Sequence, residues 1–194
     1  MSIDYYNQHA EQFATDTLSV DMRLLYDTFL PLLPPQAHIL DAGCGAGRDA
    51  ANFLRLGYRV SAFDASDELA RIASQHSGLA VQHCTFLDYH SPQLLDAIWA
   101  CASLLHVPEV QMSTTLQHLG NQLKPGGIFY LSFKYGEQDS ERGGRQFTNS
   151  TEDRLRNHLH NTGLSIQECW LTGDQRPGRE DEQWLNALLV KDKP

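Results

Sequence analysis

Short apolar runs alternate along most of the chain with segments whose apolar residues recur at helical spacing. The apolar runs predict strands at residues 38–40, 58–63, 81–86, 96–102 and 128–133. The periodic segments predict helices at residues 21–33, 48–56, 67–75 and 109–123. Strands that alternate with helices are typical of a parallel sheet covered on both faces, because parallel neighbours need a crossover connection.

The C-terminal part follows a different pattern. A predicted helix at 152–160 precedes two strands, at 164–171 and 184–191, with only a turn-rich loop between the strands. Two strands joined without a helix are expected to pair antiparallel. We therefore predict an α/β fold with a Rossmann-like, seven-stranded, mostly parallel sheet. One antiparallel strand lies near the C-terminus, and helices cover both faces.

A glycine-rich turn follows the first predicted strand. In the segment ILDAGCGAGRD, residues 39–49, glycine occupies every second position from Gly43 to Gly47, and the turn opens a helix. Glycine permits a sharp turn and a close approach of the backbone to a ligand. In the dinucleotide motif GxGxxG the last glycine follows two spacer residues, but here that position is Arg48. An NAD-dependent oxidoreductase is therefore disfavoured, and a tight turn without a ligand is the structural alternative.

An acidic residue, Asp64, ends the second predicted strand. In nucleotide-binding folds a carboxylate at this distance from the turn accepts hydrogen bonds from the ribose hydroxyls. The alternative for this position is a helix N-cap, for which Ser66 is an equally good candidate.

Composition narrows the class of protein. The chain has 15 Lys and Arg against 24 Asp and Glu, and its charge of −9 argues against nonspecific nucleic-acid binding, which needs a basic face. No apolar run is long enough to span a bilayer, and residues 1–17 are unlike a signal or transit peptide. We expect a cytoplasmic enzyme with no membrane or nucleic-acid partner, as a monomer or homodimer.

The pattern of Cys and His residues predicts no metal site. The cysteines form no CxxC pair, which favours reduced thiols over disulfides or a zinc site. His158 and His160 point to different sides of a predicted helix and have no evident third partner, so we expect them to be exposed.

Five segments, in order, resemble the motifs of class I S-adenosylmethionine-dependent methyltransferases. They are LDAGCGAGRD, FDAS, FLDY, LDAIWACASLLHV and LKPGGIFYLSF, and they cover about residues 39–133. The aromatic N-terminal arm and the tail at 176–186 resemble a small bacterial subgroup related to tellurite-resistance methyltransferases. The resemblance implies S-adenosylmethionine as cofactor and methyl transfer as the reaction.

The resemblance also implies a cofactor site. Its residues are Tyr6, Asp41, Gly43, Gly45, Gly47, Asp64, Ala65, Leu87, Asp88, Ala100 and Cys101. The glycines and Asp41 would lie by the methionine moiety, with Asp64 at the ribose. Leu87 and Asp88 would flank the adenine, although Asp88 also fits a surface turn. Backbone carbonyls at Ala100 and Cys101 would meet the methionine ammonium group, and the Cys101 side chain fits packing rather than nucleophilic chemistry.

The acceptor side is less well defined. His106 follows the fourth strand at the rim of the sheet, where it is a candidate to orient or deprotonate an acceptor, or is a structural histidine. The arm with Tyr5, Tyr6 and Phe13 predicts a lid over the cofactor, or a helix docked on the core.

Three arginines predict an anion site on the acceptor side. Arg145, Arg176 and Arg179 lie in loops expected near the carboxyl ends of the strands, where guanidinium groups hold carboxylates, phosphates or oxyanions. The alternative is solvated loop charge, neutralised by the acidic residues Glu180, Asp181 and Glu182.

We therefore expect one methyltransferase domain over residues 1–194. Residues 1–36 form an arm over the cofactor, 37–133 the cofactor-binding core, and 134–194 the substrate-side loop, helix and hairpin. The expected activity is methyl transfer to a small molecule, for which an anion is one option. A silent S-adenosylmethionine-binding module and a tellurite or selenite methyltransferase are the alternatives.

Overall fold

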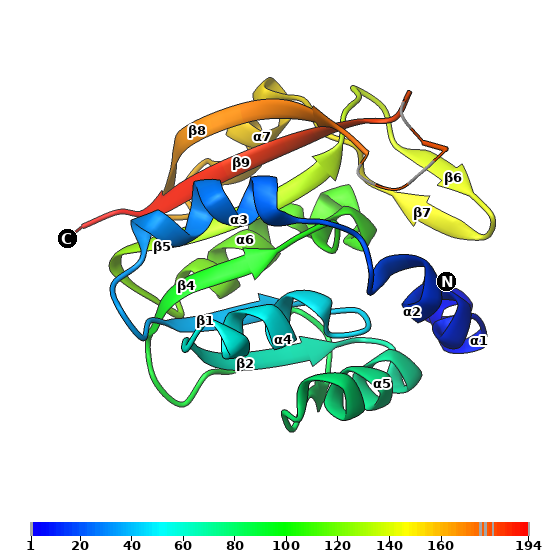
Figure 1. The fold of residues 1–194 in the computed structure, drawn as a ribbon. Coiled ribbons are helices and arrows are strands. Elements are labelled where there is room, and N and C mark those ends of the chain that lie inside the picture. The colour runs from blue at the N-terminus through cyan, green and yellow to red at the C-terminus, as the bar shows by residue number, and fades with distance from the viewer. Residues whose placement is uncertain (1, 175, 177, 180, 194) are drawn as a thin grey trace.

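Seven strands form one twisted sheet at the centre of the protein (Figure 1). The computed structural model describes residues 2–174, 176, 178–179 and 181–193. The strands are β1 (His38–Ala42), β2 (Arg59–Asp64), β3 (Gln82–His83), β4 (Leu95–Ala100), β5 (Leu123–Lys134), β8 (Leu164–Gly173) and β9 (Gln183–Lys191). Their order is β3-β2-β1-β4-β5-β9-β8, and β9 runs antiparallel to both of its neighbours. The predicted fold class is confirmed.

Helices cover both faces of this sheet (Figure 1). They are α3 (Arg23–Phe29), α4 (Arg48–Arg55), α5 (Asp67–Ser77), α6 (Glu109–Gly120) and α7 (Glu152–Leu159), whereas α1 (Ser2–Gln8) and α2 (Ala10–Thr17) lie beyond the carboxyl ends of the strands. Short 3₁₀ turns occur at η1 (Leu30–Leu32) and η2 (Leu104–His106), and a separate hairpin pairs β6 (Ser140–Arg142) with β7 (Arg145–Phe147). Among the described residues, no helix combines the length and apolar character that crossing a membrane requires.

Alternate residues of the strands feed two separate cores, because successive side chains of a strand point to opposite faces. Leu40 and Ile98 pack with α6 and α7, whereas Ile39 and Trp99 pack with α3 and α4. Trp99 stacks on Tyr130 with ring centroids 4.0 Å apart. These buried side chains fix the sheet, whose carboxyl edge carries the candidate site.

Several predicted boundaries were wrong. The third strand is only Gln82–His83, because it is a sheet edge paired with β2 alone and the chain turns at Thr85. The helix predicted at 109–123 ends at Gly120, since Leu123 pairs with Leu95 and starts β5. The helix predicted at 21–33 gives way to the 3₁₀ turn η1 at Leu30, where Pro31 follows.

Two further features of the substrate-side region differ from expectation. His158 is buried rather than exposed, because α7 turns this side toward Glu109 of α6. The hairpin β6–β7 was not predicted, because its residues are mostly polar and exposed and show no apolar alternation.

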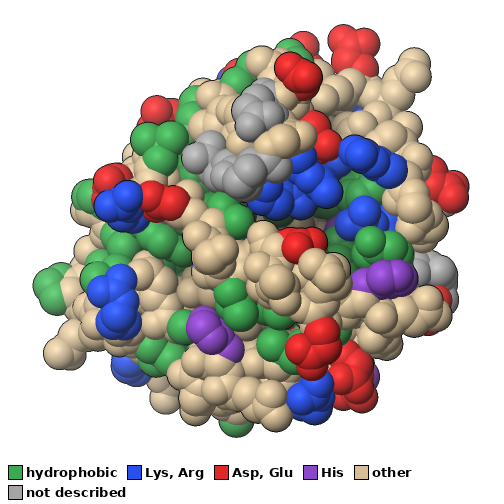
Figure 2. Space-filling model, turned by 45° about the vertical axis from the view of Figure 1, so that its right-hand side comes forward, with side chains coloured by type: hydrophobic (Ala, Val, Ile, Leu, Met, Phe, Trp, Pro, Cys, Tyr) green, Lys and Arg blue, Asp and Glu red, His purple; other side chains and the backbone are tan. Residues whose placement is uncertain are grey.

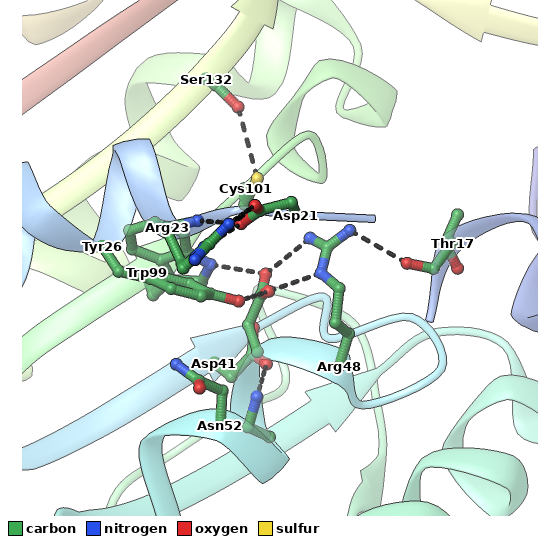
Figure 3. A network of polar contacts seen from close by, with 12 residues as sticks. Thr17, Asp21, Arg23, Tyr26, Asp41, Arg48, Asn52, Trp99, Cys101 and Ser132 are labelled. Carbon is green, nitrogen blue, oxygen red and sulfur yellow. Dashed lines mark hydrogen bonds and ion pairs between the residues drawn. The ribbon is translucent and has the colours of Figure 1, made fainter. Parts of the chain in front are cut away.

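A buried carboxylate, Asp49, joins α3, α4 and β4, and Figure 3 shows its partners Tyr26, Arg48 and Trp99. It accepts hydrogen bonds from Arg48 Nε at 2.7 Å, from Trp99 Nε1 at 2.8 Å and from the Tyr26 hydroxyl. Burial alone would raise the pKa of Asp49, but Arg48, Tyr26 and Trp99 outweigh burial and hold that pKa below its ordinary value. This carboxylate thereby ties α3 and α4 to β4.

We expect Asp49→Ala to lower the free energy of unfolding by about 3–5 kcal/mol, because the partly buried Arg48 loses its partner and the buried Trp99 N–H loses its acceptor. Urea denaturation followed by circular dichroism measures this loss. Asp27→Asn, at an exposed position of α3, is the control and should change stability by less than about 0.5 kcal/mol. Equal effects of both substitutions would contradict the structural role of Asp49.

Candidate active site

A cavity of about 90 Å³ lies at the carboxyl ends of β1, β2 and β4, beneath the arm formed by α1 and α2. It is lined by Ser2, Ile3, Tyr6, Phe13, Gly43, Gly45, Phe63, Asp64, Ala65, Ser66, Leu69, Phe86, Ala102, Ser103 and His106. Small-molecule pockets in proteins usually measure about 300–1,000 Å³. The cavity is therefore smaller than the pockets that usually hold a whole small molecule.

The glycine-rich turn forms the floor of this cavity. Gly43 has φ +72°, and a Cβ there would lie 2.6 Å from Cβ of Ser103, so the turn excludes any side chain. Gly45, with φ +56°, lies under the ring of Phe13, which a Cβ would meet at 3.0 Å. Gly47 does not line the cavity and instead faces Ala73 of α5, so its role is close packing of α4 against α5.

Asp64 is held in place by two backbone N–H groups. Gly45 N donates to Oδ2 and Ser66 N donates to Oδ1, both at 2.8 Å. Burial raises the pKa of Asp64 to about 6, against the lowering effect of these N–H groups. Each oxygen keeps acceptor capacity for a ligand hydroxyl. The N-cap of α5 is Ser66, whose Oγ accepts from Leu69 N at 3.2 Å.

Three of the other residues implied by resemblance lie outside the cavity. Asp41 is buried behind the turn, where Oδ2 accepts from Ala50 N at 2.9 Å, and burial with the nearby Asp49 raises the pKa of Asp41. Leu87 and Asp88 are exposed, and Asp88 accepts from the Thr85 hydroxyl at 2.6 Å.

Positions at the end of β4 and beyond are divided between the core and the cavity. Ala100 is fully buried, and burial raises the pKa of the Cys101 thiol to about 12, which keeps Cys101 a neutral packing residue. Ala102 and Ser103 reach the cavity instead. Ala102 has φ +52°, unusual for a residue with a Cβ, and its N–H donates to Ser132 Oγ at 2.8 Å.

The arm meets the rim of the sheet through a Tyr6–His106 pair. The Tyr6 hydroxyl lies 2.9 Å from His106 Nε2, and His106 Nδ1 lies 3.1 Å from the carbonyl oxygen of Gln146 in β7. A carbonyl only accepts, so Nδ1 carries the hydrogen and Nε2 accepts from Tyr6. Burial lowers the pKa of His106 to about 4, helped by Arg145 and Lys134, so the imidazole is neutral at physiological pH.

The three predicted arginines differ in their pairing. Arg176 is paired with Asp174, with Nε 2.9 Å from Oδ1, and Arg179 lies 3.8 Å from Glu182. Glu180, named above as a further neutralising residue, lies outside the described residues. Arg145 has no carboxylate partner within the described part of the chain, and its guanidinium stacks over Tyr5 at 4.2 Å. Figure 2 shows Lys and Arg side chains, in blue, gathered in a hollow of the surface near the centre of the view.

Sequence reasoning missed several cavity residues. Phe86, Phe63, Ala102, Ser103, Ser66 and Leu69 line the cavity but were not predicted as site residues. Phe86 was detectable as the aromatic residue that opens the FLDY segment, and it meets Phe63 edge-on at 5.4 Å. Ser103 reaches the turn through a hydrogen bond to the Ala42 carbonyl at 2.7 Å, a long-range contact with no local signal.

Comparisons with known proteins agree with this geometry. Residues 39–127 match the family model described as a methyltransferase domain. The chain is 34% identical over 105 residues to a ubiquinone biosynthesis O-methyltransferase of Xanthomonas campestris pv. campestris (strain B100), covering 50% of this chain and 43% of the relative. The corresponding enzyme of Xanthomonas axonopodis pv. citri (strain 306) is 33% identical over 108 residues, covering 52% of this chain and 44% of the relative. The matched part thus spans less than half the length of these relatives.

Solved structures share the fold over nearly the whole chain. One is the 1,6-didemethyltoxoflavin-N1-methyltransferase of Burkholderia thailandensis with bound S-adenosylhomocysteine, with a TM-score of 0.77 and 22% identity. The match covers 99% of this chain and 86% of that one. Another is the N-methyltransferase NodS of Bradyrhizobium japonicum WM9 with S-adenosylhomocysteine, at TM-score 0.72, 19% identity and coverage of 96% and 98%.

The domain match, the named relatives and the shared fold together support the class predicted from the sequence. Residues 39–127 are similar to a methyltransferase domain, and the chain has the Rossmann-like fold of the compared methyltransferases. The predicted cofactor agrees with the S-adenosylhomocysteine bound in two of the structural neighbours.

We expect affinity for S-adenosylhomocysteine to fall as pH decreases through about 6, because a protonated Asp64 loses acceptor capacity for the ribose hydroxyls. A proton and the ligand compete for the Asp64 carboxylate. Affinity is therefore constant at pH values above the pKa of Asp64 and falls about tenfold for each pH unit below that pKa. Calorimetry from about pH 8 to about pH 5 measures this. Asp64→Asn should bind weakly without the pH step, and the exposed Asp67→Asn should keep it. A flat profile for the unsubstituted protein would contradict the role of Asp64.

Proposed function

We propose that this protein binds S-adenosylmethionine between the glycine-rich turn and Asp64, and transfers its methyl group to a small anionic acceptor held by Arg145. The proposed acceptor is supported by which of the three loop arginines form ion pairs with carboxylates. Arg176 and Arg179 are paired with carboxylates, whereas Arg145 stacks on an aromatic ring beside the cavity and keeps its charge.

The residues present fit the proposed cofactor. Gly43 and Gly45 leave a floor that a Cβ would fill, and Asp64 offers a fixed carboxylate to two ribose hydroxyls. Phe86 supplies an apolar wall for the adenine in place of Leu87 and Asp88, which face solvent. When bound, the cofactor supplies a methyl group already activated by the positive charge on sulfur.

The protein's contribution to catalysis is then alignment. Holding an acceptor in line with the bond between sulfur and methyl can lower the barrier by about 7–11 kcal/mol. Tyr6 and Phe13 of the arm cover the cavity, which excludes water once the arm closes. The arm residues therefore serve as a lid in this proposal, and residues 134–194 carry the acceptor side.

Tellurite and selenite remain members of the proposed acceptor class, because they are small oxyanions that need no general base. The names of the Xanthomonas relatives, O-methyltransferases of ubiquinone biosynthesis, introduce an oxygen atom as a second acceptor chemistry. The similarity to those relatives covers about half of this chain. The acceptor of those proteins is therefore only a candidate for this one. We further propose a cytoplasmic enzyme without nucleic-acid partners.

Calorimetry with S-adenosylmethionine, with NADH as the comparison ligand, tests the cofactor half of the proposal. We expect binding of the sulfonium compound and none of NADH. A screen of small thiols, selenite, tellurite and carboxylates for production of S-adenosylhomocysteine then identifies the acceptor. Binding without product from any acceptor would favour a silent binding module, and absence of binding would reject the proposal.

For the acceptor found in that screen, we expect Arg145→Gln to raise KM by about 10- to 100-fold, the worth of one charge-assisted hydrogen bond. Arg179→Ala is the matched test of the loop arginines, and because Arg179 faces Glu182 it should change KM less than threefold or so. Steady-state kinetics measure both. Unchanged KM in Arg145→Gln would remove Arg145 from the acceptor site.

A further inference from the structure

We infer that the reacting atom of the acceptor is itself negatively charged when it binds, and that Arg145 stabilises this charge in place of a general base. The inference rests on the proposed function and narrows its substrate class. It assigns acceptors such as thiolates, acidic phenolates and oxyanions, and it excludes neutral amines and alcohols.

The first observation is that neither His106 nor Tyr6, which meet where the arm contacts the rim of the sheet, is free to take a proton. His106 Nδ1–H donates to a carbonyl, and the lone pair of Nε2 is occupied by the Tyr6 hydroxyl at 2.9 Å. The Tyr6 oxygen in turn lies next to Arg145, which counteracts the effect of burial on the pKa of Tyr6 through a hydrogen bond and its charge. The hydrogen bonds therefore form one chain: Arg145 donates to Tyr6, Tyr6 donates to His106, and His106 donates to the Gln146 carbonyl.

The surroundings of His106 also oppose protonation. Arg145 and Phe147 of β7, Lys134 of β5 and Tyr6 of α1 face the ring. Lys134 lies 2.9 Å from Glu182, which is its own counter-charge. No described carboxylate forms an ion pair with His106, and burial outweighs the hydrogen bond to the Gln146 carbonyl, which by itself would raise the pKa of the ring. His106 is thus a positioning residue for Tyr6.

The second observation is the state of Arg145. Its guanidinium lies over Tyr5 at 4.2 Å and over Phe147 at 5.4 Å, and no carboxylate of the described residues pairs with it. Its Nε is buried and has no hydrogen-bond partner in the described structure. Aromatic rings hold the cation in place without neutralising its charge, so Arg145 is able to pair with an anion.

The chemistry balances without a proton transfer. A lone pair on the acceptor anion forms the bond to the methyl carbon while the bond between that carbon and sulfur breaks. The bonding electrons pass to sulfur, so the sulfonium becomes a neutral thioether and the acceptor loses one unit of negative charge. The product of a monoanionic acceptor is neutral and no longer attracted to Arg145, which favours its release.

The test uses 4-nitrophenol, whose anion is yellow and whose acid is colourless, with protein saturated by S-adenosylhomocysteine. Titration is carried out at the pH where half of the free probe is ionised. We expect binding to raise the ionised fraction, with about a tenfold preference for the anion. Arg145→Gln should lose this rise and Arg145→Lys should keep most of it. Arg142→Gln, an exposed arginine of the same hairpin, is the matched control and should keep all of it.

His106→Gln separates the two ways of producing an anion. If Arg145 stabilises the charge, the bound probe remains ionised in this variant; if His106 takes the proton, the yellow form is lost and the inference is overturned. A probe that binds as the acid, or whose colour does not change, would also overturn it. Binding of S-adenosylhomocysteine is measured separately by calorimetry. Failure of that binding rejects the proposed function, whereas intact binding without the colour change rejects only the assigned substrate class.

Discussion

The contact between the Asp64 carboxylate and the glycine-rich turn sets the shape of the cavity. The turn is fastened to the end of β2 by side-chain and backbone groups together. Gly45 N binds the carboxylate, while Gly43 N and Cys44 N donate to the carbonyl oxygen of Phe63 at 3.0 and 2.9 Å. These bonds satisfy N–H groups that a sharp turn would otherwise leave without partners. A ligand that binds here meets a preformed floor and a carboxylate that is already oriented.

Charged side chains have different roles in the core and at the proposed acceptor site: in the core they form an ion pair, and at the proposed acceptor site the charge of Arg145 is held by aromatic rings. Asp49 and Arg48 neutralise each other beneath the sheet, and hydrogen bonds from Tyr26 and Trp99 complete that pair. Arg145 is held by aromatic stacking, worth about 0.5–2 kcal/mol, whereas a hydrogen bond to a charged group is worth about 1.5–3 kcal/mol. In the proposed site an anion would therefore compete with these rings for Arg145, but no ligand would gain by separating Arg48 from Asp49.

Patterns that are local in sequence predicted most of the fold. The runs at β1, β2, β4 and β5 are apolar because both faces of these strands are covered, and such runs are visible in any single sequence. The edge strand β3 and the hairpin β6–β7 lack this cover, so their residues carry no such pattern. Their positions are decided by partners far along the chain.

The same distinction applies to the candidate site. Gly43, Gly45 and Asp64 line the cavity, and each carries its signal within a few residues of sequence. Placing Asp88 at the adenine followed from resemblance, whereas here its neighbour Phe86 turns inward and Asp88 bonds to Thr85. The Tyr6–His106 pair joins residues 100 positions apart, and the burial that lowers the pKa of His106 exists only in the folded protein.

The arm connects the two halves of the proposed active site. Helix α1 has no buried residues, so its position depends on contacts made at its surface. Asn7 hydrogen-bonds to Ser66 at 2.6 Å on the cofactor side, while Tyr5 and Tyr6 meet Arg145 and His106 on the acceptor side. In the proposed mechanism, an anion that engages Arg145 competes with its contact to Tyr5. Methyl transfer removes that negative charge, so Arg145 is free to stack on Tyr5 again. The charge of the acceptor and the closure of the arm are thus coupled through one guanidinium group.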